Sequence, residues 1–295
     1  MPIDETIGRC NREVNCGYHV KPTKGVRSCP PLAGVGGGKA RSLSRPPSFI
    51  PYKYFTPSLT GLDSSNNFLQ YLCTLFSRKR VEKAFIDYFI GTSKHWPGAT
   101  VFWQIDKNAN VRTGKVMLYN PITGHRVKDP FNHISWAHKL LDIKNFNLRQ
   151  CLFGEHLLTN TTQKVAAIVE SEKTAVIASI VLPEYVWLAS GSLQNLNAEK
   201  CKVLRDCKRV ILFPDVRGYD LWKAKSRELG LRKVHVSDML EKRASPEERA
   251  AGIDLADYIL KASLRQGCEG RADASRNPKA HEVQRNNPVE LRSPT

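Results

Sequence analysis

The sequence predicts an α/β protein in which a mostly parallel sheet is flanked by helices. A small basic α+β domain and a partial zinc ribbon are expected to precede it. Residues 152–260 alternate short apolar strands with helical patterns, as βαβ units do. Two of those strands end in an acidic residue. The first 150 residues hold 22 basic and nine acidic side chains, whereas residues 151–262 hold 17 and 15.

The composition indicates a folded chain that binds a polyanion. Its 295 residues are 41% hydrophobic and 25% charged, with a formal net charge of +17, which favours nucleic acid as the partner. No apolar run approaches the roughly 18 residues of a membrane span, and residues 1–8 do not resemble a signal peptide. We therefore expect a cytoplasmic protein with no membrane partner. Without a secretion signal, the eight cysteines predict thiols or metal ligands rather than disulfides.

Residues 1–24 carry part of a zinc-binding pattern. Cys10 and Cys16 lie near each other, and the glycine after Cys16 lets backbone amides approach a sulfur. Tetrahedral zinc needs four ligands, and only His19 and Cys29 are available to complete the set. No CxxC pair occurs in the chain. Zinc binding by this chain alone is therefore not expected, and we expect the missing ligand pair just upstream in the native reading frame.

Residues 25–58 predict a linker, because five glycines and six prolines oppose both a helix and a buried core. Residues 33–40 resemble a phosphate-binding loop, but Ala33 replaces its first glycine and Ala40 replaces its Ser/Thr. No strand precedes this segment. An NTPase is therefore rejected.

Residues 59–150 predict a basic domain with two helices and a β-hairpin. Apolar residues at helical spacing predict the helices within residues 66–89, and residues 100–106 and 111–119 predict the strands. The connection between the helices is either a solvated turn or a phosphate contact, and it contains Arg78, Lys79 and Arg80. The second strand carries Arg112 and Lys115, which either contact nucleic acid or protect a solvated edge from aggregation.

Residues 151–262 predict the parallel sheet, and its strand ends carry the chemistry. Glu170 follows an apolar strand and precedes a helix, and Asp215 follows another strand. Neighbouring strand ends would bring the two carboxylates together, where α/β sheets bind ligands and where carboxylates can hold Mg²⁺. For either acid alone, capping of the following helix is the alternative. Residues 263–295 lack aliphatic periodicity and are expected to be disordered.

The chain resembles the toprim fold of primases, topoisomerases and related nucleases. The resemblance lies in these strand ends, in the turn at residues 190–192 and in residues 252–258. More narrowly, the chain resembles a domain-of-unknown-function family of toprim-bearing proteins carried by bacterial mobile elements. In that family a zinc ribbon precedes the globular part. The resemblance covers residues 8–19 and about 60–262. The stretches that carry it are 9–19, 101–106, 112–120, 146–157, 169–175, 195–203 and 253–260.

The resemblance implies roles for individual residues. Glu170 would act as general acid/base, and Asp215 would hold Mg²⁺. Lys173, at the start of a helix, would meet a phosphate, since anions favour helix N-termini. Arg112 and Lys115 would guide the template.

The chain departs from the toprim pattern two residues after Asp215. Toprim enzymes usually place a further acid there, whereas this sequence has Arg217, which would repel a second cation yet could grip a phosphate. Asp220 is the expected replacement ligand, with Asp254 or Asp257 as alternatives. At most one weak Mg²⁺ site is expected.

Two functions follow from the resemblance. The first is primase-like, Mg²⁺-dependent phosphoryl transfer in mobile-element DNA replication, by a nucleotidyltransferase or nuclease. Its partners would be single-stranded DNA and a replicative helicase or mobilisation proteins. The alternative is a catalytically degenerate toprim-fold module that binds DNA without chemistry. An RNA- or zinc-binding adaptor rests on Cys10 and Cys16 alone and is the weakest alternative.

Overall fold

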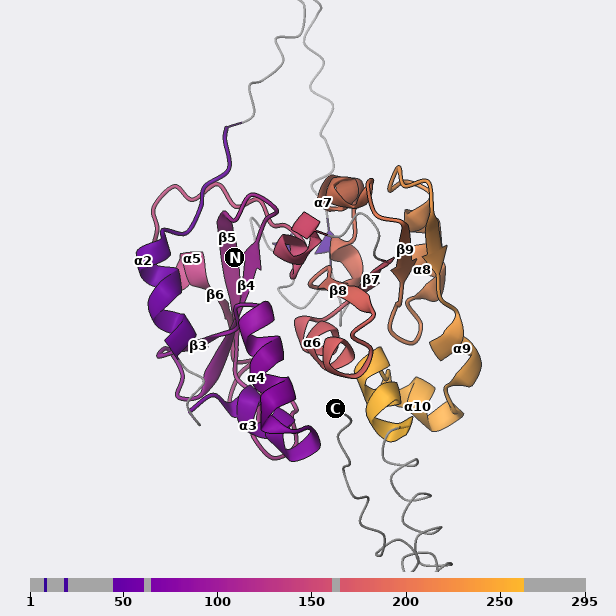
Figure 1. The fold of residues 1–295 in the computed structure, drawn as a ribbon, viewed down its shortest axis with the longest axis horizontal. Coiled ribbons are helices and arrows are strands. Elements are labelled where there is room, and N and C mark those ends of the chain that lie inside the picture. Colours follow the sequence, from indigo (N-terminus) through magenta and orange to yellow (C-terminus); the bar gives the residue numbers. More distant parts are fainter. Residues whose placement is uncertain (1–7, 10–18, 21–44, 61–64, 161–164, 263–295) are drawn as a thin grey trace, which may run out of the picture. The chain divides into compact units, whose positions relative to one another are not determined.

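The computed structural model describes residues 8–9, 19–20, 45–60, 65–160 and 165–262 (Figure 1). The chain forms two compact units, Met1–Ser44 and Arg45–Thr295. In the first unit, β1 (Gly8–Arg9) pairs antiparallel with β2 (His19–Val20). The second unit contains two four-stranded sheets. Among the described residues, none of the helices combines the length and hydropathy that a membrane span requires.

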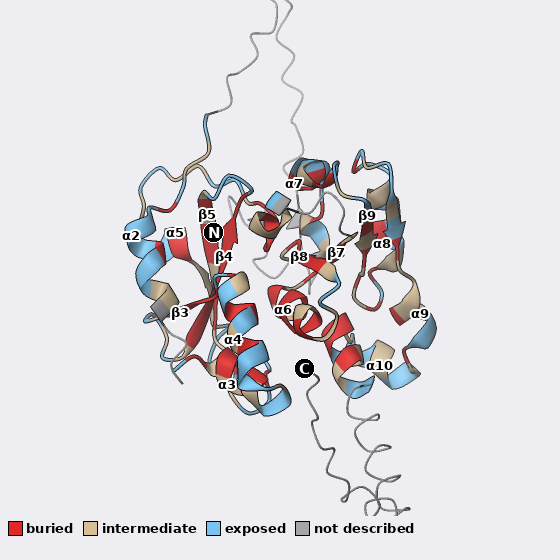
Figure 2. Cartoon of the chain, in the orientation of Figure 1, coloured by how far each residue is buried: buried red, intermediate tan, exposed pale blue. Residues whose placement is uncertain are grey.

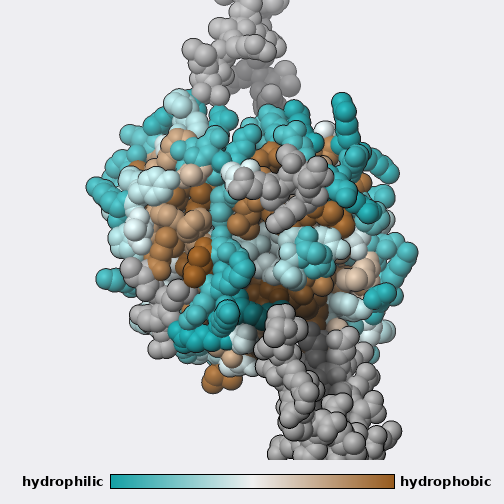
Figure 3. Space-filling view, viewed as in Figure 1, coloured by the Kyte–Doolittle hydropathy of each residue, from teal (hydrophilic) through white to brown (hydrophobic). Residues whose placement is uncertain are grey.

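The two helices predicted within residues 66–89 are confirmed. α3 (Asn67–Leu75) begins after Asn66, whose side-chain oxygen accepts hydrogen bonds from the backbone N–H groups of Phe68 and Leu69. This N-cap satisfies donors that the first helical turn leaves unpaired. α4 (Arg78–Asp87) follows directly. Its apolar face is buried, and Figure 3 shows hydrophilic residues along its outward side.

The first sheet is antiparallel, with strand order β3-β4-β5-β6. The predicted hairpin is confirmed as its two central strands. The four strands are β3 (Gly91–Ser93), β4 (Ala99–Ile105), β5 (Val111–Met117) and β6 (Ile134–Trp136). Every residue of β4 is buried, because both faces of the sheet are covered. Phe102 packs in one core cluster with α3 and α4, whereas Val101 and Trp103 pack in another on the opposite face.

The linker predicted for residues 25–58 is wrong in its last part. α2 (Tyr52–Phe55) and η1 (Thr56–Thr60) are short helices within this range. Ile50 is 2% exposed and Phe55 is 6% exposed, both in the core cluster of β4 and β5. The short helix α5 (Ala137–Leu140) contributes Ala137 to the same core cluster. Pro51 does not prevent α2 from forming, because it occupies the N-cap position, where no backbone N–H is needed for the helix. The aromatic and aliphatic side chains between the prolines therefore override the local turn propensity.

The second sheet is parallel, with strand order β10-β9-β7-β8, and confirms the predicted fold class. Its strands are β7 (Val165–Val169), β8 (Tyr185–Ala189), β9 (Arg209–Leu212) and β10 (Val234–Val236). Alternate residues of β7 enter different core clusters: Ala167 and Val169 pack with α6 (Glu172–Val181), and Ala166 and Ile168 pack on the other face. Burial on both faces explains the continuous apolar runs of these strands.

The remaining elements are short and complete the βα alternation. They are η2 (Glu155–Asn160), η3 (Leu193–Asn195), α7 (Ala198–Cys201), η4 (Lys202–Leu204), α8 (Tyr219–Ser226), α9 (Met239–Arg243), α10 (Pro246–Ala251) and a helix at residues 255–262. From β7 the chain moves to β8 on one side and then crosses to β9 on the other. Open α/β sheets bind ligands at such a reversal, beyond the carboxyl ends of the strands.

The two sheets share a hydrophobic core. One cluster joins α3, α4 and β4 to α6, β7 and β8, and Figure 2 shows buried residues running through both sheets. Phe153 also forms an antiparallel bridge with Ala189 at the end of β8. Because Phe153 also packs edge-on against Phe102 of β4, with ring centroids 5.6 Å apart, it joins the antiparallel sheet to the carboxyl end of β8.

Candidate functional site at the carboxyl edge of the parallel sheet

Glu170 and Asp215 lie side by side at the carboxyl ends of β7 and β9. The two strands pair in parallel, with Ile168 opposite Leu212, so the residues that follow them leave the same edge of the sheet. The backbone N–H of Asp215 donates a hydrogen bond to Oε1 of Glu170 at 3.1 Å. The prediction that the two acids meet at one sheet edge is confirmed.

A tight turn holds Asp215 in place. The N–H of Gly218 donates to the carbonyl oxygen of Asp215 at 2.8 Å, and Arg217 takes a φ of 71° at the third position of the turn. A positive φ at that position is typical of a type II turn and is unusual for a side chain other than glycine or asparagine. A Cβ atom on Gly218 would lie 3.0 Å from Glu170 Oε1 and 2.9 Å from the Asp215 oxygen. The turn therefore brings bare backbone against both acids.

Asp254 and Asp257 approach the same edge from the helix at residues 255–262. The N–H of Asp257 donates to Asp254 Oδ1 at 2.9 Å, and the N–H of Asp254 donates to Asp257 Oδ2 at 3.2 Å, which is the reciprocal pattern of a capping box. Thr174, in the first turn of α6, donates its hydroxyl to Asp254 Oδ2 at 2.6 Å. We call Glu170, Asp215, Asp254 and Asp257 the acidic edge.

Glu170, Asp215 and Asp257 resist ionisation. Burial, followed by the charges of Glu170, Asp254 and Asp257, raises the pKa of Asp215 to about 9. Burial and the charge of Asp254 also raise the pKa values of Glu170 and Asp257. Burial disfavours a charged carboxylate, and a neighbouring negative charge adds to that penalty. The acidic edge is therefore short of compensating positive charge.

A divalent cation would supply the positive charge that the acidic edge lacks. Oδ1 of Asp215 is buried and accepts no hydrogen bond from the residues that the structure describes. Within residues 45–60, 65–160 and 165–262, no three His, Cys, Asp or Glu side chains are already grouped to surround a metal ion. Mg²⁺ is commonly bound through one or two carboxylates and completes its octahedron with water and substrate oxygens. Asp215, with Glu170 or Asp254 beside it, has the donor chemistry for such a cation.

Asp220 and Arg217 are exposed. Asp220 lies in the first turn of α8, and no hydrogen bond or ion pair joins it to the acidic edge in the described part of the chain. The acids that act on Asp215 are instead Glu170, Asp254 and Asp257. Arg217 donates its backbone N–H to Glu241, and its exposure leaves the guanidinium accessible to a phosphate.

Lys173 connects α6 to the loop after β5. Its Nζ atom donates to the carbonyl oxygen of Gly124 at 2.9 Å and lies 5.4 Å from the centre of the Tyr71 ring. Burial lowers the pKa of Lys173, and the charges of Asp254 and Asp257 oppose that decrease. Lys173 is thus a cation next to the acidic edge, but it already has a protein partner.

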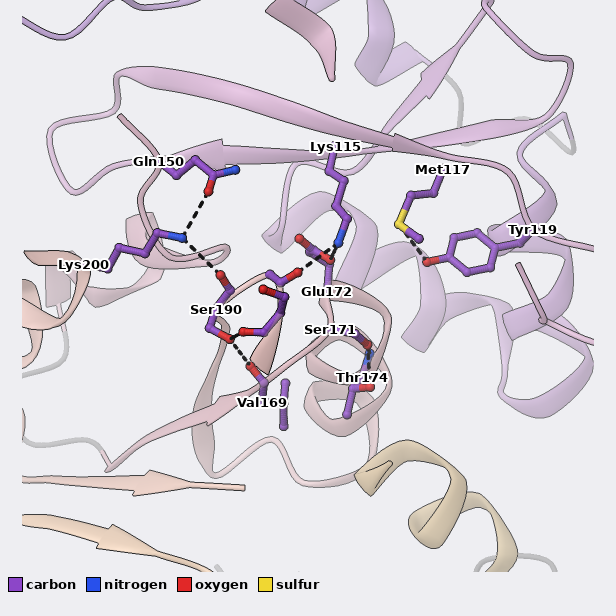
Figure 4. Close-up of polar contacts among 12 residues, drawn as sticks. Lys115, Met117, Tyr119, Gln150, Val169, Ser171, Glu172, Thr174, Ser190 and Lys200 are labelled. Atoms are coloured by element: carbon purple, nitrogen blue, oxygen red, sulfur yellow. Dashed lines mark hydrogen bonds and ion pairs between the residues drawn. The ribbon is translucent and has the colours of Figure 1, made fainter. Parts of the chain in front are cut away.

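Arg112 and Lys115 make ion pairs within the protein. Lys115 points from β5 to the first turn of α6, where its Nζ donates to Glu172 Oε2 at 3.0 Å and to the Gly191 oxygen at 3.2 Å (Figure 4). Glu172 is 1% exposed. Arg112 donates to Asp106 Oδ2 at 2.6 Å. Both basic side chains therefore stabilise the junction or the hairpin, and contact with template by either remains a prediction.

The cluster at residues 78–80 is at the start of α4. Arg78 pairs with Glu82 at 2.7 Å, and Arg80 donates to the Ile180 oxygen and lies over the Phe76 ring. Lys79 is exposed. The predicted zinc ligands Cys10 and Cys16 lie outside the described residues.

Three polar residues at this junction were not expected from the sequence, although one of them carries a local signal. Glu172 pairs with Lys115, and its Oε1 has no partner among the described residues. Lys200 is 9% exposed and donates to the Ser190 oxygen at 3.2 Å and to Gln150 Oε1 at 3.3 Å (Figure 4). Thr174 could have been found from the Ser-x-x-Thr spacing, since Ser171 is the N-cap of α6 and accepts from the Thr174 N–H. Lys200 carries no comparable local signal.

The fold and the acidic edge define an α/β protein with a parallel sheet whose strand ends gather carboxylates. Comparison with known families assigns it more narrowly: the family described as a domain of unknown function (DUF6371) matches residues 66–216. The chain belongs to this family. A zinc beta-ribbon finger family matches residues 1–30. No curated protein matches the chain.

Solved structures similar to the chain include three primases. The catalytic core of DnaG is 12% identical over 73% of this chain and 84% of that chain, with a TM-score of 0.43. The RNA polymerase domain of Mycobacterium tuberculosis primase DnaG is 10% identical over 77% of this chain and 92% of that chain, with a TM-score of 0.40. The primase fragment of the bacteriophage T7 primase-helicase is 16% identical over 58% of this chain and 70% of that chain, with a TM-score of 0.35.

Proposed function

We propose that the protein binds nucleic acid and carries out primase-like, Mg²⁺-dependent phosphoryl transfer in the replication of mobile-element DNA. The observation that supports this most is the contact of Glu170 with Asp215 at the reversal point of the parallel sheet, where Oδ1 of Asp215 is buried and has no hydrogen-bond partner among the described residues. The resemblance of the sequence to toprim proteins supports the reaction class. The mobile-element role rests on that resemblance alone.

The residues of the acidic edge divide the chemistry between them. Asp215, with Glu170 or Asp254, would hold Mg²⁺, which neutralises charge on a transferred phosphate and orients the reacting oxygens. Glu170 has a raised pKa, and general acid/base catalysis is most effective when the pKa approaches the working pH. Glu170 is therefore proposed to move the proton, and Arg217 to contact a phosphate from the exposed turn.

The charge distribution supports single-stranded DNA as the ligand. Residues 1–150 carry 22 basic and nine acidic side chains, and such an excess attracts a phosphate backbone without reading its sequence. A replicative helicase or mobilisation proteins are proposed as partners from the resemblance. The zinc beta-ribbon match supports zinc binding near residues 1–30, with a ligand set that this chain does not complete.

A second function is a DNA-binding module without catalysis. It is favoured by Arg217 at the position where toprim enzymes usually have another acid, and by the lack of a three-residue metal cluster in the described ranges. The two functions share the fold and the basic surface, and they differ only in whether phosphoryl transfer occurs.

Primer synthesis on a single-stranded template, with nucleotides and Mg²⁺, distinguishes them. Glu170→Gln keeps the side-chain shape and removes the proton transfer, so synthesis should fall by about 100-fold or more. Glu184→Gln is the matched control, because Glu184 is exposed and precedes β8 at the opposite end of the sheet. Equal activity of the wild type and Glu170→Gln would contradict the proposed role of Glu170. A wild type that binds template but makes no product would favour the binding module.

A further inference from the structure

The loop between β5 and β6 forms a basic pocket. It has a volume of about 530 Å³, and its lining includes His125, Arg126, Lys128 and Asp129. The loop is held to the sheet: the Val127 N–H donates to the Leu118 oxygen at 3.0 Å, and the His133 N–H donates to the Val127 oxygen at 3.2 Å. The pocket is therefore part of an ordered loop, and it presents more positive than negative charge.

This pocket lies next to the acidic edge. Gly124, directly before His125, accepts the hydrogen bond from Lys173. The same lysine Nζ lies 5.4 Å from the centre of the Tyr71 ring, and a Cβ atom on Gly124 would lie 2.3 Å from that ring, so the start of the pocket loop packs at the first turn of α6. A phosphate in the basic pocket would thus be close to the proposed catalytic residues without contacting Glu170 or Asp215.

A group of rings lies beyond the pocket, with His95 and Phe131 exposed and Trp96 and His133 half-buried. Phe131 stacks on His133 with centroids 4.3 Å apart and planes 19° apart. Trp96, from the turn between β3 and β4, lies 5.1 Å from His133 and 6.5 Å from Phe131, and His95 lies 4.4 Å from Trp96. Phe131 is 54% exposed. We call these four residues the ring platform.

The pocket and the ring platform lie within reach of one strand of nucleic acid. Lys128 and Phe131 are three residues apart, so at most about 11 Å of extended chain separates their Cα atoms. The charges of the loop favour a polyanion: Asp129 is the only acid within residues 119–133, which also contain Arg126 and Lys128. A purely hydrophobic protein partner would leave these cations unpaired. A duplex would conceal the base faces that rings stack on, whereas a single strand exposes them.

We propose, taking nucleic acid as the ligand from the proposed function, that this loop binds single-stranded nucleic acid. Backbone phosphates occupy the basic pocket at His125, Arg126 and Lys128. Bases stack on Phe131 and Trp96. The contact does not depend on sequence, because each base has a face that can stack. The loop thus holds the strand beside the acidic edge, and it requires neither Mg²⁺ nor catalysis.

The test measures binding of the full chain to a labelled oligothymidylate in EDTA by fluorescence anisotropy. Loss of one stacked base should weaken binding about tenfold, so Phe131→Ala should raise Kd by that factor, and Phe131→Trp should restore it. Ile122→Ala is the matched control, since Ile122 is 82% exposed in the same loop and has no ring. Asp215→Asn should bind like the wild type, because the metal is absent. An oligonucleotide containing 2-aminopurine should show fluorescence quenching on the wild type and not on Phe131→Ala.

Two results would overturn the proposal. If Phe131→Ala binds as tightly as the wild type and 2-aminopurine is not quenched, the rings serve another ligand, such as a protein. If Ile122→Ala weakens binding as much as Phe131→Ala, the effect belongs to the fold of the loop and not to stacking. If the wild type makes no primer but its binding still depends on Phe131, only the proposed catalysis is contradicted. The failure of this proposal and the failure of the proposed function can therefore be told apart.

Discussion

Replacing Asp215 with asparagine tests whether the acidic edge is built for a cation. The folded protein raises the pKa of Asp215 from 3.8 to about 9 through burial and the charges of its acidic neighbours. Between these values the unfolded chain releases the proton and the folded chain keeps it. The free energy of unfolding should therefore fall as the pH rises from about 4 to about 9, by about 1.4 kcal/mol per pH unit.

At pH 7 this loss amounts to about 4 kcal/mol relative to pH 4. Asparagine preserves the shape of the side chain and cannot ionise, so Asp215→Asn should be more stable than the wild type at neutral pH without metal. The pH dependence that Asp215 contributes should disappear. Mg²⁺ at 100 times its Kd should stabilise the wild type by about 2.7 kcal/mol, since it binds only the folded chain, and should not stabilise the variant.

Urea unfolding from about pH 5 to about pH 8, in EDTA and in Mg²⁺, measures both effects. Asp142→Asn is the control, because Asp142 is exposed and pairs only with Lys144 among its described neighbours. Asp220→Asn tests the ligand that the sequence predicts, and its exposed position predicts no change in Mg²⁺ binding. If Asp215→Asn responds to Mg²⁺ as the wild type does, or the wild type shows no loss of stability with pH, the proposed cation site does not exist.

Three further predictions concern binding, zinc and the turn at Asp215. Binding to single-stranded DNA should weaken with a slope of about −2 or steeper in log K against log salt, as three or more phosphate contacts require; affinity unchanged by salt in a titration would refute this. Metal analysis of the purified chain should find well under one zinc per molecule because Cys10 and Cys16 lack a CxxC partner; stoichiometric zinc would make His19 or Cys29 a ligand. Gly218→Ala should destabilise the fold by about 1–3 kcal/mol, since its Cβ would lie 2.9 Å from the Asp215 oxygen, and unchanged urea unfolding would show that the turn can relax.

The sequence by itself determined the elements and the two central acids. Apolar periodicity is a local property, so the helices within residues 66–89, the hairpin and the parallel strands follow from residues close together in the chain. The proximity of Glu170 and Asp215 could also be predicted from the sequence, because parallel strands place their carboxyl ends at one edge of the sheet. Residues 45–58 differ from their prediction for the converse reason: their four prolines are a local signal, whereas the burial of Ile50 and Phe55 depends on a sheet formed later in the chain.

Tertiary structure alone decided which charged residues meet. Asp220 is five residues from Asp215, yet it lies exposed on α8, and Asp254 reaches the acidic edge because the helix at residues 255–262 packs there. From the sequence, Lys115 is expected to be a surface cation of a basic hairpin. In the folded chain its Nζ lies 3.0 Å from Oε2 of Glu172. Phe131 and Trp96 lie 35 positions apart in the chain and become neighbours only when β3 to β6 assemble into one sheet. Spacing in the sequence predicts contacts only between residues that are close along the chain, whereas these contacts are set by strand order and by the packing of one sheet against the other.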